Sequence, residues 1–283
     1  MKAEGKQKMS RKLHEIPDIP DYNWIRRQMA EDLSYRLQDR QRKTSLGRPL
    51  YERINVQVIL TQECPYHCPF CMERQNPMTG QMNFTAQRKA LEQVLEEHPN
   101  ARLSITGGEP GLYPKQIQAL SNCYQENGNH TFLNINTSGY DAEICAYGHV
   151  NLSVNAYVHP DCSKFPNATY QTVLSDEEMT VENVVSIMDR YQDQFQSFSF
   201  RFCSQCEKHD YPVTIFHQLK EHPEIHVQTF RVGDFFTYVT FDYHNCHARI
   251  TLGDMWQQKH NQYQDGYSNI IIHPDGRIRT NWK

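Results

Sequence analysis

Three cysteines lie within eight residues of the chain, in the segment ECPYHCPFC. Cys64, Cys68 and Cys71 give the spacing C-x3-C-x2-C, and three soft thiolates on one short loop suit an iron-sulfur cluster or zinc. A structural zinc site takes four ligands. The nearby candidate for a fourth, His67, is adjacent to Cys68, so its side chain points elsewhere. Three thiolates on a cubane cluster would instead leave one iron open.

The cysteine segment must be held by the elements around it, and it directly follows the first of six predicted strands. The predicted strands are residues 55–61, 102–106, 131–136, 151–155, 197–202 and 226–230, and the predicted helices lie near 84–98, 114–127, 141–147, 180–194 and 212–222. This alternation predicts an α/β fold with a parallel sheet, closed or partly closed as a TIM-like (β/α)6 barrel. Its reactive groups are expected at the carboxyl ends of the strands.

A second segment that suits ligand binding follows the second predicted strand. It reads Thr106-Gly107-Gly108-Glu109-Pro110. Two glycines allow the backbone to approach a ligand closely, and Glu109 offers an acceptor for an ammonium group. In a parallel sheet this turn and the cysteine segment both lie at the carboxyl ends of the strands, where the reactive groups are expected.

The two segments, in this order, resemble the radical S-adenosylmethionine (SAM) superfamily. The family motif is C-x3-C-x-aromatic-C, with Phe70 at the aromatic position, and Gly107 to Pro110 is similar to the family's GGEP motif, which in relatives binds the amino group of SAM. The resemblance implies that Cys64, Cys68 and Cys71 hold a 4Fe-4S cluster. It also implies that the open iron chelates SAM, whose reductive cleavage gives a 5'-deoxyadenosyl radical that abstracts hydrogen from the substrate.

Shorter matches extend the resemblance along the chain. Thr137 and Ser138 are similar to a T-N-G segment, and Ser153 and Asn155 are similar to a V-S-L-D segment that meets SAM in relatives. Arg201 lies among phenylalanines in a predicted strand and needs a partner. That partner is either the SAM carboxylate, an anionic substrate or a structural salt bridge.

The C-terminal segment is similar to the hairpin of the molybdenum-cofactor GTP cyclases and the SPASM and twitch enzymes. Those relatives carry auxiliary-cluster cysteines there, whereas this chain has Tyr267 and Asn281. We therefore expect no auxiliary cluster of that type and no GTP cyclisation. Three other cysteines remain, Cys203, Cys206 and Cys246. They are either ligands of an unusual second cluster, a catalytic hydrogen-atom donor, or structural residues.

Composition limits the remaining possibilities. The 283 residues carry a net charge of −4, which disfavours a duplex nucleic-acid partner, and the chain shows neither a signal peptide nor a membrane span. We expect a cytoplasmic protein, whose reducing compartment keeps thiols free. The expected parts are a basic tail and N-terminal helix (1–50), the radical SAM core (51–232) and a small antiparallel β cap (233–283).

The expected substrate is a small molecule such as a nucleoside, sugar or amino-acid derivative. A ribosomally made peptide is the alternative, although about fifty residues before the first strand are too few for the winged-helix leader-binding domain of many peptide-modifying relatives. The resemblance also implies a reductant such as flavodoxin or ferredoxin. A non-catalytic iron-sulfur protein would explain the three cysteines but not the Gly-Gly-Glu-Pro turn.

Overall fold

The computed structural model describes residues 54–75, 81–127, 133–175, 177–202, 211–231, 238–251 and 269–279. Its strands are β1 (Asn55–Ile59), β2 (Arg102–Thr106), β3 (Leu133–Thr137), β4 (His149–Ser153), β5 (Thr169–Leu174), β6 (Ser197–Phe202), β7 (Ile225–Arg231), β8 (Tyr238–Tyr243), β9 (Cys246–Thr251), β10 (Asn269–Ile272) and β11 (Ile278–Arg279). Its helices are α2 (Met72–Gln75), α3 (Phe84–Glu97), α4 (Pro114–Glu126), α5 (Val181–Tyr191) and α6 (Tyr211–Glu221), with 3-10 turns η1 (Pro110–Leu112), η2 (Ala142–Ala146) and η3 (Cys162–Lys164).

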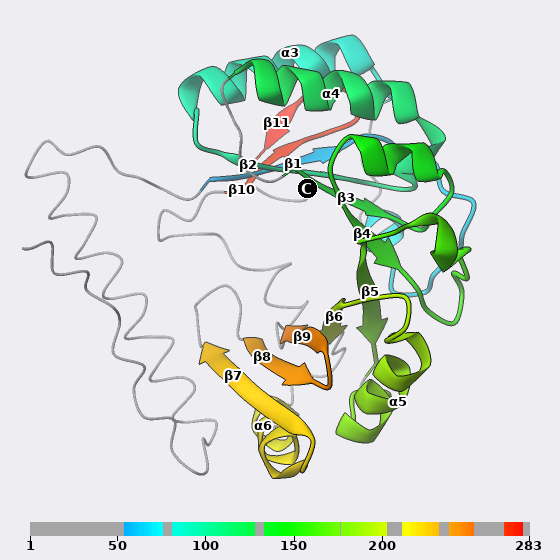
Figure 1. Ribbon diagram of the computed structural model, residues 1–283. Coiled ribbons are helices and arrows are strands. Elements are labelled where there is room, and N and C mark those ends of the chain that lie inside the picture. The colour runs from blue at the N-terminus through cyan, green and yellow to red at the C-terminus, as the bar shows by residue number, and fades with distance from the viewer. Residues whose placement is uncertain are drawn as a thin grey trace, which may run out of the picture.

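The described strands form one curved, open sheet with the helices on its outer side (Figure 1). The strand order is β11-β10-β1-β2-β3-β4-β5-β6-β9-β8-β7, and the pairs from β10 through β1 to β6 and β9 are all parallel. The prediction of an α/β core with a mostly parallel sheet is therefore confirmed. Closure into a barrel is not seen among the described strands.

Side chains alternate between the two faces of this sheet. Outward-facing residues are apolar and buried, as Val58, Ile105 and Phe200 are, and they form the core against α3, α4, α5 and α6. The inward face carries polar residues at its centre, beside the small apolar cluster of Ile59 and Ile271. A chain of hydrogen bonds crosses it from Asn151 Nδ2 to Asn136 Oδ1 (3.0 Å) and from Asn136 Nδ2 to the Ser104 hydroxyl. The described helices α3 to α6 thus leave this face of the sheet uncovered (Figure 1).

Local sequence starts the helices that support the site. The Asn83 side chain accepts a hydrogen bond from the Ala86 amide (3.1 Å) and caps α3, and Pro114 begins α4, where a missing amide proton costs nothing. From α3, the buried Gln87 amide donates to the carbonyls of Ile59 (2.8 Å) and Leu60 (3.3 Å). This contact fixes the end of β1, from which the cysteine segment leaves.

Three expectations need correction. β5 was not among the predicted strands, although polar and apolar residues largely alternate in its sequence TYQTVL. With β5 counted, the strand that contains Arg201 is the sixth along the chain, whereas it was the fifth in the prediction. The predicted sixth barrel strand, residues 226–230, lies within β7, which pairs only with β8 and antiparallel, at the edge of the sheet. Which strands pair with each other is determined by tertiary packing, and the hydrophobic periodicity of a sequence carries no information about it.

The C-terminal strands join the main sheet instead of forming a layer of their own. β9 pairs in parallel with β6, and β10 pairs in parallel with β1, whereas β8 and β11 are antiparallel to their neighbours. The described strands of the expected cap are therefore hydrogen-bonded to the strands of the core and extend the same sheet.

The predicted N-terminal helix and tail lie outside the described residues. No described helix is both long and apolar enough to cross a membrane.

Candidate active site

The carboxyl ends of β1 to β4 bring the predicted motifs to one edge of the sheet. The cysteine segment follows β1, the Gly-Gly-Glu-Pro turn follows β2, Thr137 ends β3, and Ser153 ends β4. Because these strands are parallel neighbours, the loops lie side by side. Backbone hydrogen bonds join the first two of these motifs directly.

The pairing of β1 with β2 continues past the strand ends into both motifs. The Leu60 amide donates to Thr106 (2.9 Å), the Gly108 amide to Thr61 (2.7 Å) and the Glu109 amide to Glu63 (2.7 Å). A side chain at Gly108 would collide with the Glu63 carbonyl group, so glycine is required for this approach. The segment that enters Cys64 is thus fixed by backbone hydrogen bonds.

Glu109 is fully buried and joins the loop after β2 to the loop after β3. Its Oε1 accepts from the Thr137 hydroxyl (2.5 Å) and the Gly111 amide (2.7 Å). Its Oε2 accepts from the Ser138 amide (2.6 Å) and the Ser138 hydroxyl. Four protein donors therefore occupy this carboxylate, and Thr137 and Ser138 are committed to it.

Aromatic and polar contacts tie the rim of the site together. The Phe70 ring packs edge-on against Tyr157, with 6.2 Å between centroids, and joins the cysteine segment to the turn after β4. Asn155 holds that turn, since its side-chain oxygen accepts from the Tyr157 amide (2.9 Å). On the other side, the Tyr113 hydroxyl donates to Glu63 (2.8 Å). Sequence reasoning missed Glu63 and Tyr113, which lie fifty residues apart and carry no local signal.

The three thiols of the cysteine segment are half-buried and free. Burial raises the pKa of Cys64 and of Cys68, and each of these two is raised further by the neighbouring cysteines. The three sulfur atoms therefore lie close enough for their negative charges to repel, and bound positive charge would stabilise all three thiolates together. No group of Cys, His, Asp or Glu in the described chain is arranged around a single ion.

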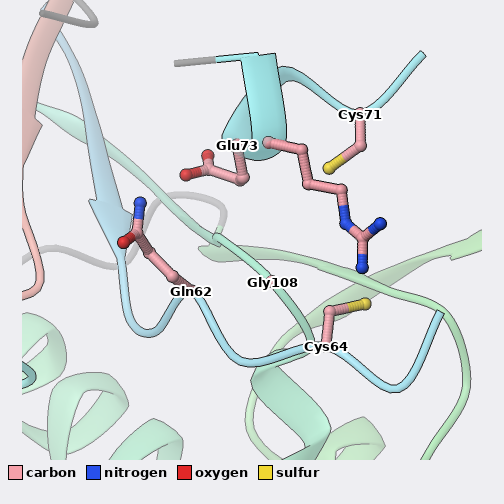
Figure 2. A pocket seen from close by; sticks show the side chains of 6 residues that line it. Gln62, Cys64, Cys71, Glu73 and Gly108 are labelled. Atoms are coloured by element: carbon pink, nitrogen blue, oxygen red, sulfur yellow. The ribbon is translucent and has the colours of Figure 1, made fainter. Parts of the chain in front are cut away.

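A cavity of about 410 Å³ opens beside the cysteines, and Cys64 and Cys71 face it from two parts of the same loop (Figure 2). It is lined by Gln62, Cys64, Cys71, Glu73, Arg74 and Gly108. A 4Fe-4S cluster binds each thiolate on a different iron, so the sulfur atoms need not converge on one point. The donor set and the space thus fit a cluster held by Cys64, Cys68 and Cys71.

Glu73 is a second residue that sequence reasoning missed. Its Oε2 is buried without a hydrogen-bond partner among the described residues, and burial raises the pKa of Glu73 to about 7. The only sequence signal was a charged residue placed directly after Cys71 and Met72. A carboxyl group therefore lies at the wall of the cluster cavity.

The remaining predicted site residues are placed as follows. Cys203 and Cys206 lie outside the described residues. Cys246 is buried, lies beside the Phe195 carbonyl (3.5 Å) and starts β9 near the amino end of β6, whereas Cys203 follows the carboxyl end of β6. The roles that we expect for these three cysteines, as ligands of a second cluster, a hydrogen-atom donor or structural residues, stay predictions. Ser153 and Arg201 both lie on the inner face of the sheet.

Thiol labelling provides a test of this arrangement. In folded, cluster-free protein, iodoacetamide at pH 8 is expected to modify Cys64 and Cys68 well before Cys123. Cys123 is 2% exposed, and burial raises its pKa to about 11, which leaves about a thousandth of it as thiolate. Peptide mass spectrometry measures the order, and urea-denatured protein is the control in which the difference should vanish. Equal labelling rates in the folded protein would contradict this placement.

Comparisons with known proteins address the same core. The sequence model of the radical SAM superfamily matches residues 58–196. No curated protein matches the chain in sequence. SuiB of Streptococcus suis bound to S-adenosylmethionine is similar in structure, with a TM-score of 0.52 and 15% identity over 84% of this chain and 62% of that one.

Two further solved structures are less similar. SuiB bound to the precursor peptide SuiA has a TM-score of 0.49 and 15% identity over 84% of this chain and 61% of that one. Native anSMEcpe with bound AdoMet has a TM-score of 0.41 and 14% identity over 53% of this chain and 51% of that one. The chain thus spans between 51% and 62% of the length of these three structures.

The matched region contains the end of β1, the cysteine segment, the Gly-Gly-Glu-Pro turn and strands β2 to β5. Family match, motif order and fold agree on this core. Residues 58–196 therefore match the radical SAM superfamily of enzymes, whose cofactors are a 4Fe-4S cluster and S-adenosylmethionine.

Proposed function

We propose that this chain cleaves SAM reductively and uses the product to take a hydrogen atom from a substrate. Cys64, Cys68 and Cys71 would hold the cluster. When bound, the cluster would supply the electron for reductive cleavage of a carbon-sulfur bond of SAM, a reaction that would give methionine and the 5'-deoxyadenosyl radical that takes hydrogen from a substrate. The observation that carries the proposal is the backbone ladder that joins the cysteine segment to the Gly-Gly-Glu-Pro turn.

The chain's own residues would have distinct roles in this reaction. Gly107 and Gly108 let the turn pack against Thr61 and Glu63, and Gly108 lines the cavity beside Cys64, where the amino group of SAM would bind. Glu109 would not bind SAM through its side chain, because four protein donors already occupy it. We assign it, with Thr137 and Ser138, to positioning the turn. Phe70 and Asn155 would position the rim through Tyr157.

A small polar molecule is the substrate that we favour. The inner face of the sheet offers hydroxyl and amide groups along β5, β6 and β9, namely Gln171, Ser199 and Thr251, and polar molecules are recognised by such groups. A peptide is the second candidate, because SuiB was also solved with the precursor peptide SuiA. That likeness concerns the fold alone, so we rank the peptide second.

The reaction needs an external electron donor and a reducing setting. We propose a flavodoxin or ferredoxin as the reductant and the cytoplasm as the compartment, because free cluster-binding thiols persist where the glutathione pool is reduced. Purified flavodoxin and dithionite can be compared as donors in the assay that follows.

Anaerobic reconstitution tests the function directly. We expect about four irons and four sulfides per chain, and we expect reduced protein with SAM to release 5'-deoxyadenosine. Iron counting and liquid chromatography with mass spectrometry measure the two quantities. About eight irons would indicate a second cluster. No 5'-deoxyadenosine from a fully loaded, reduced protein would contradict the proposed function.

A further inference from the structure

Two arginines lie together on the inner face of β6 and β9. In the parallel register Ser199 pairs with Arg249, and Arg201 pairs with Thr251. Paired residues of adjacent strands project to the same face, opposite the buried Phe198 and Phe200. The Cα atoms of the two arginines are therefore diagonal neighbours, about 8 Å apart from the strand spacing and the rise per residue.

The Arg249 side chain packs on an aromatic ring, and the nearby carboxylate of Asp242 binds other residues. The Arg249 guanidinium lies over the Tyr238 ring, 4.1 Å from its centroid. Asp242, on the same face of β8, accepts from Gln228 (2.5 Å) and pairs with His247 (2.9 Å). The Asp242 carboxylate thus already has two partners, Gln228 and His247.

Arg201 carries its charge without compensation from the described residues. Within the described ranges it forms no hydrogen bond or ion pair with a carboxylate. Its side chain is reached by solvent, yet surrounding protein atoms desolvate it, and both this and the positive charge of Arg249 lower the pKa of its guanidinium. Two like charges on a crowded surface repel each other, and an anion between them would relieve that repulsion.

We propose that Arg201 and Arg249 form a subsite for an oxyanion of the substrate, either a carboxylate or a phosphate group. Guanidinium groups bind both anions through paired hydrogen bonds, and the hydroxyls of Ser199 and Thr251 lie beside them as further donors. This inference rests on the proposed function. It narrows the substrate to an anionic molecule anchored at β6 and β9.

The position of the pair separates this anion from the carboxylate of SAM. The cysteine segment follows β1, and strands β2 to β6 lie between β1 and β9 in the sheet. The SAM carboxylate would chelate iron at the cysteines, so it would be held near β1. An anion at Arg249 would instead belong to a second molecule bound across the inner face.

Binding of two simple probes tests the subsite. Inorganic phosphate and acetate are titrated separately into reconstituted protein by NMR, with and without saturating SAM. We expect at least one probe to bind with a millimolar dissociation constant in both conditions. Phosphate alone would indicate a phosphate-bearing substrate, acetate alone a carboxylate, and both an unselective oxyanion subsite. No binding of either, or displacement of the probe by SAM, would overturn the proposal.

Variants assign the binding to this pair. Arg249→Met and Arg201→Met should each weaken probe binding about tenfold, because each removes a charged hydrogen-bond donor. Arg249→Lys keeps the positive charge, so its affinity for the probe should lie between those of the wild type and Arg249→Met. This variant shows whether the weaker binding of Arg249→Met comes from the lost charge and not from loss of folding. Arg190→Met, at the end of α5, is the matched control and should bind as the wild type does. Unchanged binding in both methionine variants would overturn the proposal.

The same preparations separate this proposal from the proposed function. Release of 5'-deoxyadenosine from SAM without substrate reports the radical chemistry, whereas probe binding reports the subsite. Cleavage of SAM without probe binding would reject the subsite alone. Probe binding without SAM cleavage in fully loaded, reduced protein would reject the proposed function while the arginine subsite stands as an anion site.

Discussion

Replacing Cys68 with alanine is expected to lower bound iron from about four atoms per chain to below about one. Production of 5'-deoxyadenosine should fall to the background of the assay. Cys68 lies between Cys64 and Cys71, and its backbone carbonyl accepts from the Cys71 amide (3.2 Å), so the three thiols belong to one short turn. Two remaining thiolates would leave two irons of the cluster without protein ligands, because the described chain gathers no other set of ligands.

The matched control is Cys145→Ala. Cys145 is also half-buried and free, but it lies in η2 and packs against the core. We expect this variant to keep its iron and its SAM cleavage, with a loss in unfolding free energy of about 1 kcal/mol for the deleted sulfur. Iron retained at the wild-type level in Cys68→Ala would show that the cysteine segment does not hold the cluster.

The cysteine segment could be predicted from sequence because its chemistry is local. A cluster-binding loop needs cysteines at a fixed spacing, and the turn that packs beside it needs glycines. Both needs can be recognised from the local sequence without knowing the neighbours of the loop in the fold. The parallel order of β1 to β4 follows from alternation of strands and helices. Together these two signals were enough to bring both motifs to one edge.

The contacts that support the site could not be predicted in the same way. Glu109 suggested an acceptor for SAM, but its partners Thr137 and Ser138 come from a different strand. Likewise, β9 lies beside β6 although β7 and β8 intervene in the chain, and this order alone brings Arg201 and Arg249 together. Such neighbours are chosen by tertiary packing, which leaves no periodic signal in the sequence.

Glu109→Gln should destabilise the protein before any cofactor is bound. An amide offers one oxygen in place of two, so its amino group would face donors that now bind a carboxylate. We expect the free energy of unfolding of the cluster-free protein to fall by about 3 kcal/mol, measured by urea titration. The matched control is Glu92→Gln, whose exposed ion pair with Arg88 is worth about 0.5 kcal/mol.

The same substitution should reach the cofactor site through the backbone. The Glu109 amide donates to Glu63, one residue before Cys64, so a turn that shifts would also move the start of the cysteine segment. We expect SAM to bind reconstituted Glu109→Gln about tenfold more weakly than wild type, as is usual when a residue that supports a ligand is changed. Lower stability with unchanged SAM affinity would show that Glu109 supports the fold alone. Weaker SAM binding at unchanged stability would instead indicate that the Glu109 carboxylate contacts the ammonium group of SAM directly.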